Sequence, residues 1–279
     1  MANFHVIAGP DADSPVHPAI RKIGTADLKD ALTKGVDDFM AMPTHLAFLG
    51  LIYPLFGIGL GALTFSNNAL PLLFPLVSGF ALLGPIAAVG LYELSRRREL
   101  GLDTSLSHVF DVLRSPSLPA IGALGVVLMV LFLVWLASAQ ALYVWLMGPT
   151  APESYVGFLS EVFTTARGWA LIILGHAVGF VFAAAVFTIG VISFPLLLDR
   201  DVGAGCAVQT SVRAVVANPG TMALWAAIIA VLLIVGSAPL LVGLAVVMPV
   251  LGHASWHLYR RTVEPSERAN PAPSDSSPR

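Results

Sequence analysis

Seven ionisable or strongly polar side chains lie within or at the edges of long apolar stretches, where such groups are functional candidates by default. They are His45, Glu93, Gln140, His176, Asp199, His253 and His257. Histidines can ligate a haem iron or another metal, and a carboxylate beside a serine can serve nucleophilic catalysis. The depth of each residue along its stretch decides which of these chemistries is geometrically possible.

The spacing of the histidines argues against a haem or metal site. His176 lies near one end of its stretch, roughly 35 Å along a straight helix from Asp199. His253 lies roughly 10 Å from Arg260, at the opposite depth, so the two histidines cannot share one metal ion. His45 lies at the same depth as His253, but nothing around them supplies the hydrogen bonds that orient metal-ligating imidazoles. We therefore expect no metal or cofactor ligands.

Signatures of catalysis are also absent from the sequence. It contains no HExxH, no GxSxG and no phosphate-binding glycine loop. Ser193 and Ser211 lie near Asp199 without a histidine close in sequence, which favours hydrogen bonding between helices. Cys206 is the only cysteine, so an internal disulfide and a cysteine-based metal cage are excluded. We predict no catalytic residue.

The composition indicates a protein that lies largely in lipid. Hydrophobic residues make up 56% of the 279 residues and charged residues only 11%, against about 25% charged in soluble domains. Such a chain cannot cover its own surface in water. The net charge of −2 provides no basic field for nucleic acid.

Six stretches are long enough to cross a bilayer, which takes about 20 residues per helix. We predict an all-α membrane protein whose membrane domain spans residues 28–263, between disordered cytoplasmic segments at 1–27 and 264–279. The predicted transmembrane helices are 43–65, 70–94, 118–147, 169–198, 220–236 and 239–259.

The distribution of cations predicts the orientation. Of the 15 lysines and arginines, only Arg167 falls on one side of the predicted spans, and all the others fall on the opposite side. Cytoplasmic loops carry such an excess. We expect both termini in the cytoplasm and the protein in a bacterial inner membrane.

The sequence also suggests an internal repeat. Three segments align on the prolines Pro43, Pro116 and Pro219: ALTKGVDDFMAMPTHLAF (31–48), TSLSHVFDVLRSP (104–116) and AVQTSVRAVVANPGTMAL (207–224). Further along, GPIAAVGLYELSRR (84–97) overlays MPVLGHASWHLYRR (248–261). The shared order predicts three pseudo-repeated helical hairpins, each preceded by a short amphipathic cytoplasmic helix.

Two of these short helices have a clear apolar face. In the first the face comprises Leu28, Ala31, Leu32, Val36 and Phe39, and in the second it comprises Leu106, Val109, Phe110 and Leu113. Such helices either cap the bundle beneath them or lie flat at the lipid headgroups. The sequence leaves both interpretations open.

Two long segments resemble a known family. SGFALLGPIAAVGLYELSRRRELG (78–101) and SFPLLLDRDVGAGCAVQTSVRAVVANPGTMALWAAIIA (193–230) are similar to the DUF2189 family of predicted bacterial integral membrane proteins. The similarity extends over about residues 28–262. It implies a multi-span inner-membrane protein without an established activity. The links of some members to cytochrome c oxidase do not transfer to this chain, which lacks matching haem or copper ligands.

The strongest polar feature is a set of charges at the cytoplasmic ends of the spans, here named the charged rim. Its members are Glu93, Arg96, Arg97, Arg98, Asp199, Arg200, Arg213, Arg260 and Arg261. They are candidate contacts for anionic lipid headgroups or for a partner protein. The alternative is that they only set the topology and form local salt bridges such as Glu93–Arg97. His176, His253 and Gln140 are the candidate polar groups inside the membrane.

These observations favour a non-enzymatic scaffold, an assembly factor or a lipid-interacting partner of a membrane complex, for example a respiratory complex. A transporter or channel for a small or amphipathic molecule is the alternative, because the repeats and the proline-bearing spans suit it. A cavity lined by Glu93, Gln140 and His253 would favour transport. The expected partners are membrane lipids and a protein of a membrane complex, and the sequence does not determine the oligomeric state.

Overall fold

The computed structural model describes residues 6, 18–42, 71–150, 152, 154–238 and 242–265. Over these residues every regular element is a helix, apart from one isolated β-bridge between Ile20 and Val263. The helices are α1 (Thr25–Ala41), α3 (Leu73–Phe80), η3 (Ala81–Leu83), α4 (Gly84–Ala87), α5 (Val89–Glu99), η4 (Leu106–Arg114), α6 (Leu118–Met147), α7 (Tyr155–Thr164), α8 (Ala166–Gly190), α9 (Ser193–Asp199), α10 (Gly203–Ala217), α11 (Pro219–Ser237) and α12 (Leu244–Thr262). The all-helical class is confirmed for this part of the chain.

Four helical stretches in the described ranges are long and apolar enough to cross a membrane. They are Phe74–Glu99, Leu118–Met147, Ala166–Asp199 and Pro219–Ser237. They correspond to the second to fifth predicted spans, and the first, 43–65, lies outside the described residues. α12 overlaps the sixth from Leu244 onward but is not among the four, because its second half carries polar and charged side chains that lower the hydropathy, namely His253, His257, Arg260 and Arg261.

Prolines interrupt two of these stretches. Pro195 has no N–H to donate to residue 191, and the chain turns at residues 191–192, between α8 and α9. Pro85 likewise has no N–H to donate to the Ala81 carbonyl four residues earlier, and the α-helix gives way to the 3₁₀ turn η3 at Ala81. The turn at residues 191–192 thus coincides with the backbone hydrogen bond that Pro195 cannot make.

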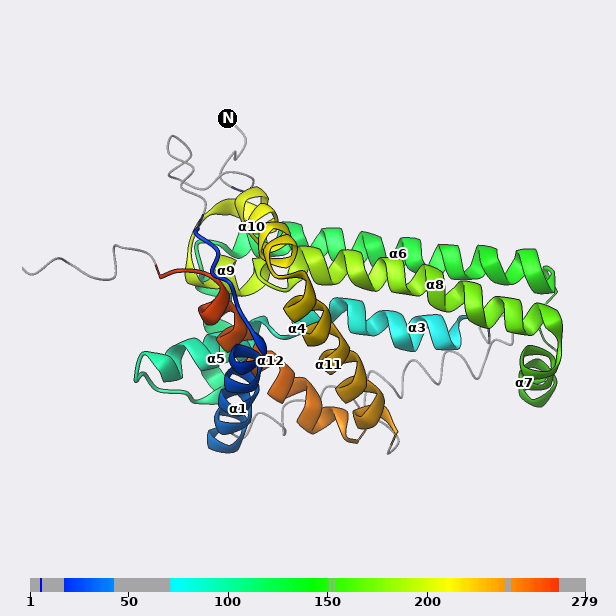
Figure 1. Cartoon of the computed structure of the whole chain (residues 1–279), viewed down its shortest axis with the longest axis horizontal. Coiled ribbons are helices and arrows are strands. Elements are labelled where there is room, and N and C mark those ends of the chain that lie inside the picture. The colour runs from blue at the N-terminus through cyan, green and yellow to red at the C-terminus, as the bar shows by residue number, and fades with distance from the viewer. Residues whose placement is uncertain are drawn as a thin grey trace, which may run out of the picture.

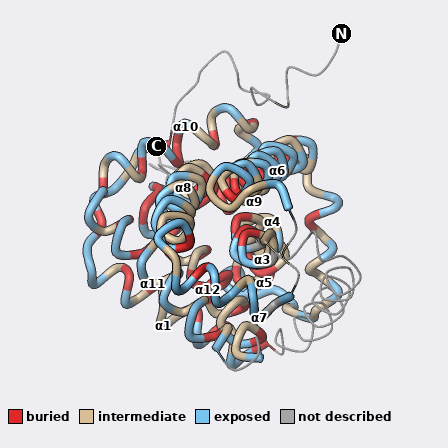
Figure 2. The backbone as a smooth tube through the Cα atoms, turned by 90° about the vertical axis from the view of Figure 1, so that its right-hand side faces the viewer, coloured by how far each residue is buried: buried red, intermediate tan, exposed pale blue. Residues whose placement is uncertain are grey.

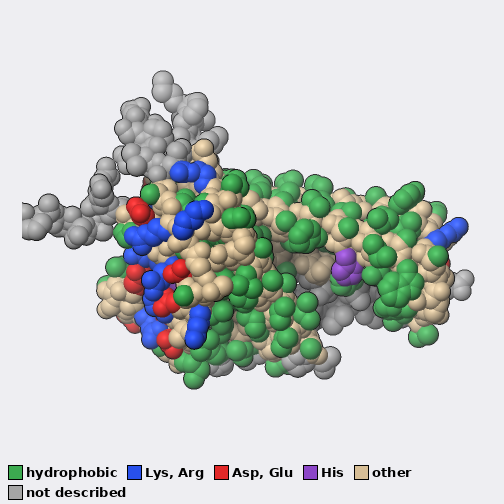
Figure 3. Space-filling view, viewed as in Figure 1, with side chains coloured by type: hydrophobic (Ala, Val, Ile, Leu, Met, Phe, Trp, Pro, Cys, Tyr) green, Lys and Arg blue, Asp and Glu red, His purple; other side chains and the backbone are tan. Residues whose placement is uncertain are grey.

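The helices form an elongated bundle with two different ends (Figure 1). α6 and α8 run side by side along the molecule, with α3 packed beside α6, and α7 lies at their far end. α1, α5, α9, α10 and α12 gather at the opposite end, which also carries most of the charged side chains (Figure 3). We call this the charged end.

The buried core is concentrated at the charged end. The residues Ser193 to Leu197 of α9 are all buried, and Trp225, Trp256 and Tyr259 are among the largest fully buried side chains. Along α6, α8 and α11 the outward residues are exposed and the contacts between helices are buried (Figure 2). The exposed apolar surface of these long helices suits contact with lipid.

The short amphipathic helices cap the ends of the long ones. η4 packs on α5, α10 packs on α9, and α1 packs on α12. The buried face of α1 comprises Leu28, Ala31, Gly35 and Asp38. The capping interpretation therefore holds for this face of α1.

The expected apolar face of η4 is divided in two. η4 is a 3₁₀ helix with three residues per turn, so positions three apart share a face. Val112 is buried at 9% exposure, whereas Phe110 and Leu113 are exposed at 67% and 63%. Counting 3.6 residues per turn had placed Phe110 and Leu113 on the same face as Leu106 and Val109.

The two ends of the described chain are tied together at the charged end. Arg21 N–H donates to the Thr262 carbonyl at 2.8 Å, and Glu264 N–H donates to the Ala19 carbonyl at 3.1 Å. The Asn218 side chain accepts from Ile23 N–H at 3.0 Å. Residues 18–24, part of the segment expected to be disordered, thus hold α1 against α11 and α12.

Close approach of α1 and α12 requires a glycine. A Cβ on Gly35 would lie 2.7 Å from both the Cβ and the backbone nitrogen of Ala254, and 2.8 Å from the Val250 carbonyl oxygen. Backbone atoms cannot move aside as a flexible side chain can. We expect Gly35→Ala to lower the free energy of unfolding by about 1–3 kcal/mol, measured by denaturant titration in detergent. Gly122→Ala in α6 is the control, because a Cβ there meets nothing within 4 Å, and equal effects of the two substitutions would contradict this packing.

Candidate functional site

The main polar site lies where α1, α5 and α12 meet. It comprises Asp38, Ser95, Arg98, His253 and His257, here named the Asp38 cluster. Asp38 shares the inward face of α1 with Ala31 and Gly35, so the helix carries its carboxylate into the contact with α12. The Asp38 side chain is only 4% exposed.

Three side chains donate hydrogen bonds to the Asp38 carboxylate. Ser95 Oγ donates to Oδ2 at 2.6 Å, and His257 Nε2 donates to the same oxygen at 2.9 Å. The Arg98 guanidinium pairs with Oδ1. One buried carboxylate thus joins all three helices.

These bonds determine the tautomer of His253. Ser95 has one hydroxyl proton, which goes to Asp38, so Ser95 Oγ must accept a hydrogen bond from His253 Nδ1 at 2.7 Å. His253 Nε2 is then the unprotonated nitrogen. The His253 side chain is 0% exposed, and its Nε2 has no hydrogen-bond partner in the described part of the chain.

The surroundings of Asp38 lower the pKa of its carboxyl. Burial raises the pKa of its carboxyl, but the hydrogen bonds from His257, Ser95 and Arg98 outweigh burial and hold the pKa below the ordinary value of 3.8. The cluster is therefore a charged site with its negative charge neutralised by Arg98.

The order of the groups differs from that of a hydrolytic triad. In a triad the histidine lies between the acid and the nucleophile and removes the proton of the nucleophile. Here Ser95 lies between Asp38 and His253, and it donates its proton to the acid. Ser95 is also 0% exposed. The arrangement holds helices together and does not activate a nucleophile.

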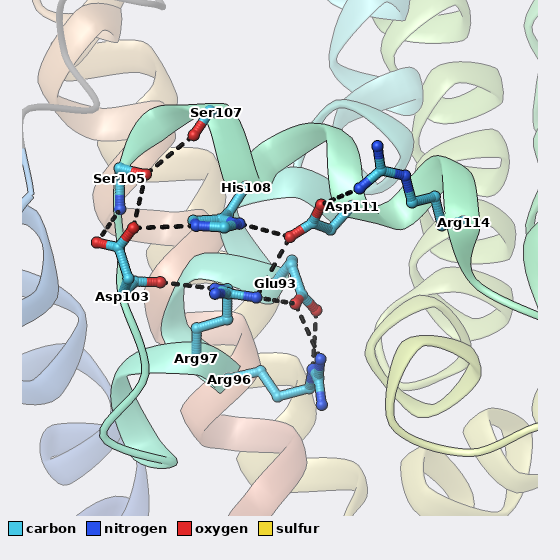
Figure 4. Close-up of polar contacts among 9 residues, drawn as sticks. All are labelled: Glu93, Arg96, Arg97, Asp103, Ser105, Ser107, His108, Asp111 and Arg114. Carbon is cyan, nitrogen blue, oxygen red and sulfur yellow. Dashed lines mark hydrogen bonds and ion pairs between the residues drawn. The ribbon is translucent and has the colours of Figure 1, made fainter.

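A second polar site joins η4 to α5 (Figure 4). Arg97 Nε donates to the Asp103 carbonyl at 2.6 Å, and Arg97 Nη1 donates to Asp111 Oδ2 at 3.2 Å. The two ring nitrogens of His108 lie 2.6 Å from Asp111 Oδ2 and 3.0 Å from Asp103 Oδ2. The hydrogen bond from His108 is the main cause that lowers the pKa of Asp111. These contacts fix η4 on the end of α5.

Ion pairs join most of the remaining members of the charged rim. Glu93 accepts two hydrogen bonds from the Arg96 guanidinium, at 2.8 and 2.9 Å. The expected Glu93–Arg97 pair is present at 4.0 Å. Both contacts lie within α5, as the local salt-bridge interpretation predicts.

A further group of contacts links α9 and α12 to α5. Arg260 pairs with Glu99 at 2.9 Å and with Asp199 at 3.7 Å. Tyr259 Oη donates to Asp199 Oδ2 at 2.6 Å, and Arg200 lies 3.5 Å from the same oxygen. Most rim charges are therefore engaged with other residues of the same chain.

Two rim arginines differ in their surroundings. Arg261 binds Asp30 of α1 through two nitrogens, at 2.8 and 2.9 Å. Arg213, on α10, is exposed and makes no ion pair or side-chain hydrogen bond in the described ranges. Arg213 is thus the rim cation most open to an external anion.

The three candidate polar groups inside the membrane do not converge. Gln140 lies 22 residues into α6 from Leu118, roughly 33 Å along the helix, and its Oε1 is buried without a partner among the described residues. His176 is exposed on α8, donates from Nδ1 to the Ile172 carbonyl at 2.7 Å, and lies beside the ring of Phe74. His253 belongs to the Asp38 cluster at the other end.

The sequence-based candidates did not include Asp38, Ser95, Asp30, Glu99 or Asp111. One local signal was available for Asp38, because an acid on the apolar face of a helix requires a buried partner. Another was the i, i+4 spacing of His253 and His257. No group of three His, Cys, Asp or Glu side chains suited to a metal ion occurs in the described ranges.

Loss of the Asp38 charge should destabilise the protein. Asp38→Asn leaves Arg98 without its counter-ion and at least one buried hydrogen bond unmade. We expect a loss of about 1–3 kcal/mol in the free energy of unfolding. Asp37→Asn, at an exposed neighbouring position, should change it by less than about 0.5 kcal/mol. Denaturant titration of both variants in detergent makes the comparison, and similar losses in the two would argue against the cluster.

The same carboxylate should make stability depend on pH in acid. Because the pKa of Asp38 is lower in the folded chain than its ordinary value of 3.8, its contribution is fully present above that value and disappears as the pH falls through the folded pKa. Unfolding midpoints measured from about pH 6 to pH 3 should fall more steeply in the wild type than in Asp38→Asn. Parallel curves would show that another group causes the loss.

Comparison with known proteins supports the membrane assignment. Residues 73–199 match the DUF2189 family, described as a predicted integral membrane protein. The matched range includes α3 to α9, and with it Glu93 and the Arg97–Asp111 contact. No curated protein and no solved structure matches the chain. The predicted resemblance to the DUF2189 family is thus confirmed over residues 73–199, and the match and the four apolar helical stretches together support a multi-pass integral membrane protein.

Proposed function

We propose that this protein is a non-enzymatic scaffold, assembly factor or lipid-interacting partner of a membrane complex. The observation that carries the proposal is the interlocked set of ion pairs at the charged end. These pairs connect α1, α5, η4, α9 and α12 with one another. A cross-linked polar end on an apolar bundle suits the positioning of another membrane protein.

We place this protein in a bacterial inner membrane with both termini in the cytoplasm. Most of the described lysines and arginines gather at the charged end (Figure 3), whereas Arg167 is the second residue of α8, beside α7 at the far end. An excess of cations marks the cytoplasmic side of inner-membrane proteins. The β-bridge between Ile20 and Val263 brings both ends of the described chain to this same side.

The proposal includes six spans in three repeated hairpins. Equivalent positions of the aligned segments make equivalent contacts. In the alignment Arg97 corresponds to Arg261, and Asp103 corresponds to Asp30. Arg97 donates to the backbone oxygen of Asp103. Arg261 donates to the side-chain carboxylate of Asp30. The pairing of α1 with α12 then repeats that of η4 with α5. This agreement supports a common plan for the units.

The interior of the Asp38 cluster supports a structural role over an enzymatic one. Ser95 and His253 are the groups with nucleophile and base chemistry, and both are 0% exposed. A substrate would have to separate α1, α5 and α12 to reach them. Such a separation would leave the buried Asp38 carboxylate without its hydrogen-bond donors and its counter-ion Arg98, which is unfavourable.

Transport of a small or amphipathic molecule is the second candidate. Gln140 Oε1 and Trp225 Nε1 are buried without hydrogen-bond partners among the described residues, and Pro195 ends a continuous helix within one span. Such features suit a path that opens and closes. However, Gln140 is far from Glu93 and His253 along the bundle, so the lining expected for a transport cavity does not assemble.

Purification of the tagged full-length protein from its native membrane in a gentle detergent tests the proposal. Quantitative mass spectrometry should find a membrane protein at fixed stoichiometry, and a visible spectrum checks for a bound chromophore. Arg213→Glu should release that partner, since Arg213 is the exposed rim cation without an internal ion pair, while Arg167→Glu should retain it. Purification without any stoichiometric protein would overturn the scaffold and favour transport.

A further inference from the structure

Three short helices at the charged end leave a large apolar side chain exposed at the same register. When the three segments are aligned on Pro43, Pro116 and Pro219, the residue three positions earlier is Met40, Leu113 and Val216, respectively. Their exposed fractions are 77%, 63% and 71%. We call Met40, Leu113 and Val216 the apolar collar.

Each member of the collar has an apolar neighbour one helical turn earlier. Val36 precedes Met40 by four residues in α1, and Val212 precedes Val216 by four in α10. In η4 the neighbour is Phe110, three residues before Leu113, as a 3₁₀ turn requires. These neighbours are exposed at 44%, 36% and 67%, respectively. The inward faces of the same helices pack on the bundle, so each helix has a second, outward apolar face.

The position of the collar identifies what covers it. α6 begins at Leu118 and α11 at Pro219, so Leu113 and Val216 lie within a few residues of the points where apolar spans begin. α1 and α10 lie on opposite sides of the charged end (Figures 1 and 2). A single protein partner covers one side of a molecule, whereas a bilayer surrounds it.

The charges beside the collar favour an anionic leaflet. The Arg114 side chain, next to Leu113, is 87% exposed. It forms an ion pair with Asp111 at 3.6 Å, and the exposed remainder of the guanidinium faces the surroundings. Arg213, three residues before Val216, is exposed. In α1 the neighbouring charge is that of Asp37, so the cations that favour anionic headgroups come from η4 and α10. Exposed arginines near a membrane surface attract acidic lipids.

We propose that the apolar collar inserts into the headgroup layer of an anionic leaflet and fixes the depth of the charged end in the membrane. The three helices thereby hold the bundle on one face and the lipid on the other. Their apolar side chains reach the boundary of the acyl chains, as in helices that lie in the membrane plane. This role does not depend on a protein partner.

Spin labels at single cysteines test the insertion in nanodiscs of phosphatidylglycerol and phosphatidylcholine. In a Cys206→Ser background, Met40→Cys, Leu113→Cys and Val216→Cys are each labelled and exposed to oxygen or to a water-soluble nickel complex. Val130→Cys, on the exposed face of α6, is the lipid control, and Pro265→Cys, beyond α12, is the aqueous control. The collar labels should respond more to oxygen than to nickel, like the lipid control.

Two other outcomes would overturn insertion. Nickel accessibility similar to that at Pro265 would place the collar in water. Protection from both reagents would place it under protein, either a partner or a second copy of this chain.

The preference for anionic lipid is tested separately with spin-labelled phosphatidylglycerol and phosphatidylcholine. Arg114→Gln and Arg213→Gln should each lower the relative association of phosphatidylglycerol by about fivefold. Arg167→Gln, at the opposite end, should leave it unchanged. An equal preference in all three variants would refute the role of the two arginines.

Discussion

The buried carboxylate of Asp38 is the constraint on which the charged end depends. A buried charge is costly unless it is paired and hydrogen-bonded, and Asp38 meets this requirement only when α1, α5 and α12 are all in place. Its partners Ser95 and His257 lie 57 and 219 residues away in the sequence. The carboxylate therefore ties the first described helix to the last one.

This contact belongs to one of three similar helix pairs at the charged end, η4 with α5, α10 with α9 and α1 with α12. η4 follows α5 and α10 follows α9 in the chain, so those two pairs form between neighbours in sequence. α1 packs on α12, which lies at the other end of the described chain. Gly35 allows the close approach, and Arg261–Asp30 adds an ion pair beside it. The pair of α1 and α12 thus depends on tertiary contacts alone, whereas short connections in the chain assist the other two pairs.

The membrane explains why polar contacts and core residues gather at one end. In lipid, apolar side chains gain little by leaving their surroundings, so α6, α8 and α11 keep much of their apolar surface exposed. At the charged end the surroundings become polar, and burial of Trp256 and Tyr259 together with ion pairing stabilises the fold. A cross-linked end of this kind suits a scaffold, and a collar at its edge suits a fixed depth in the leaflet.

The sequence by itself determined the membrane class, four of the spans and the end at which the charges gather. Hydropathy and cation counts are local properties of the chain, and α6 begins and ends at the predicted residues 118 and 147. Tertiary structure alone decided which residues meet in the Asp38 cluster, because they come from three helices, α1, α5 and α12, that are distant in sequence. It also decided the outward face of η4, where a 3₁₀ turn replaces the expected 3.6-residue period. The partners of a buried charge depend on which helices meet, and no local pattern encodes that.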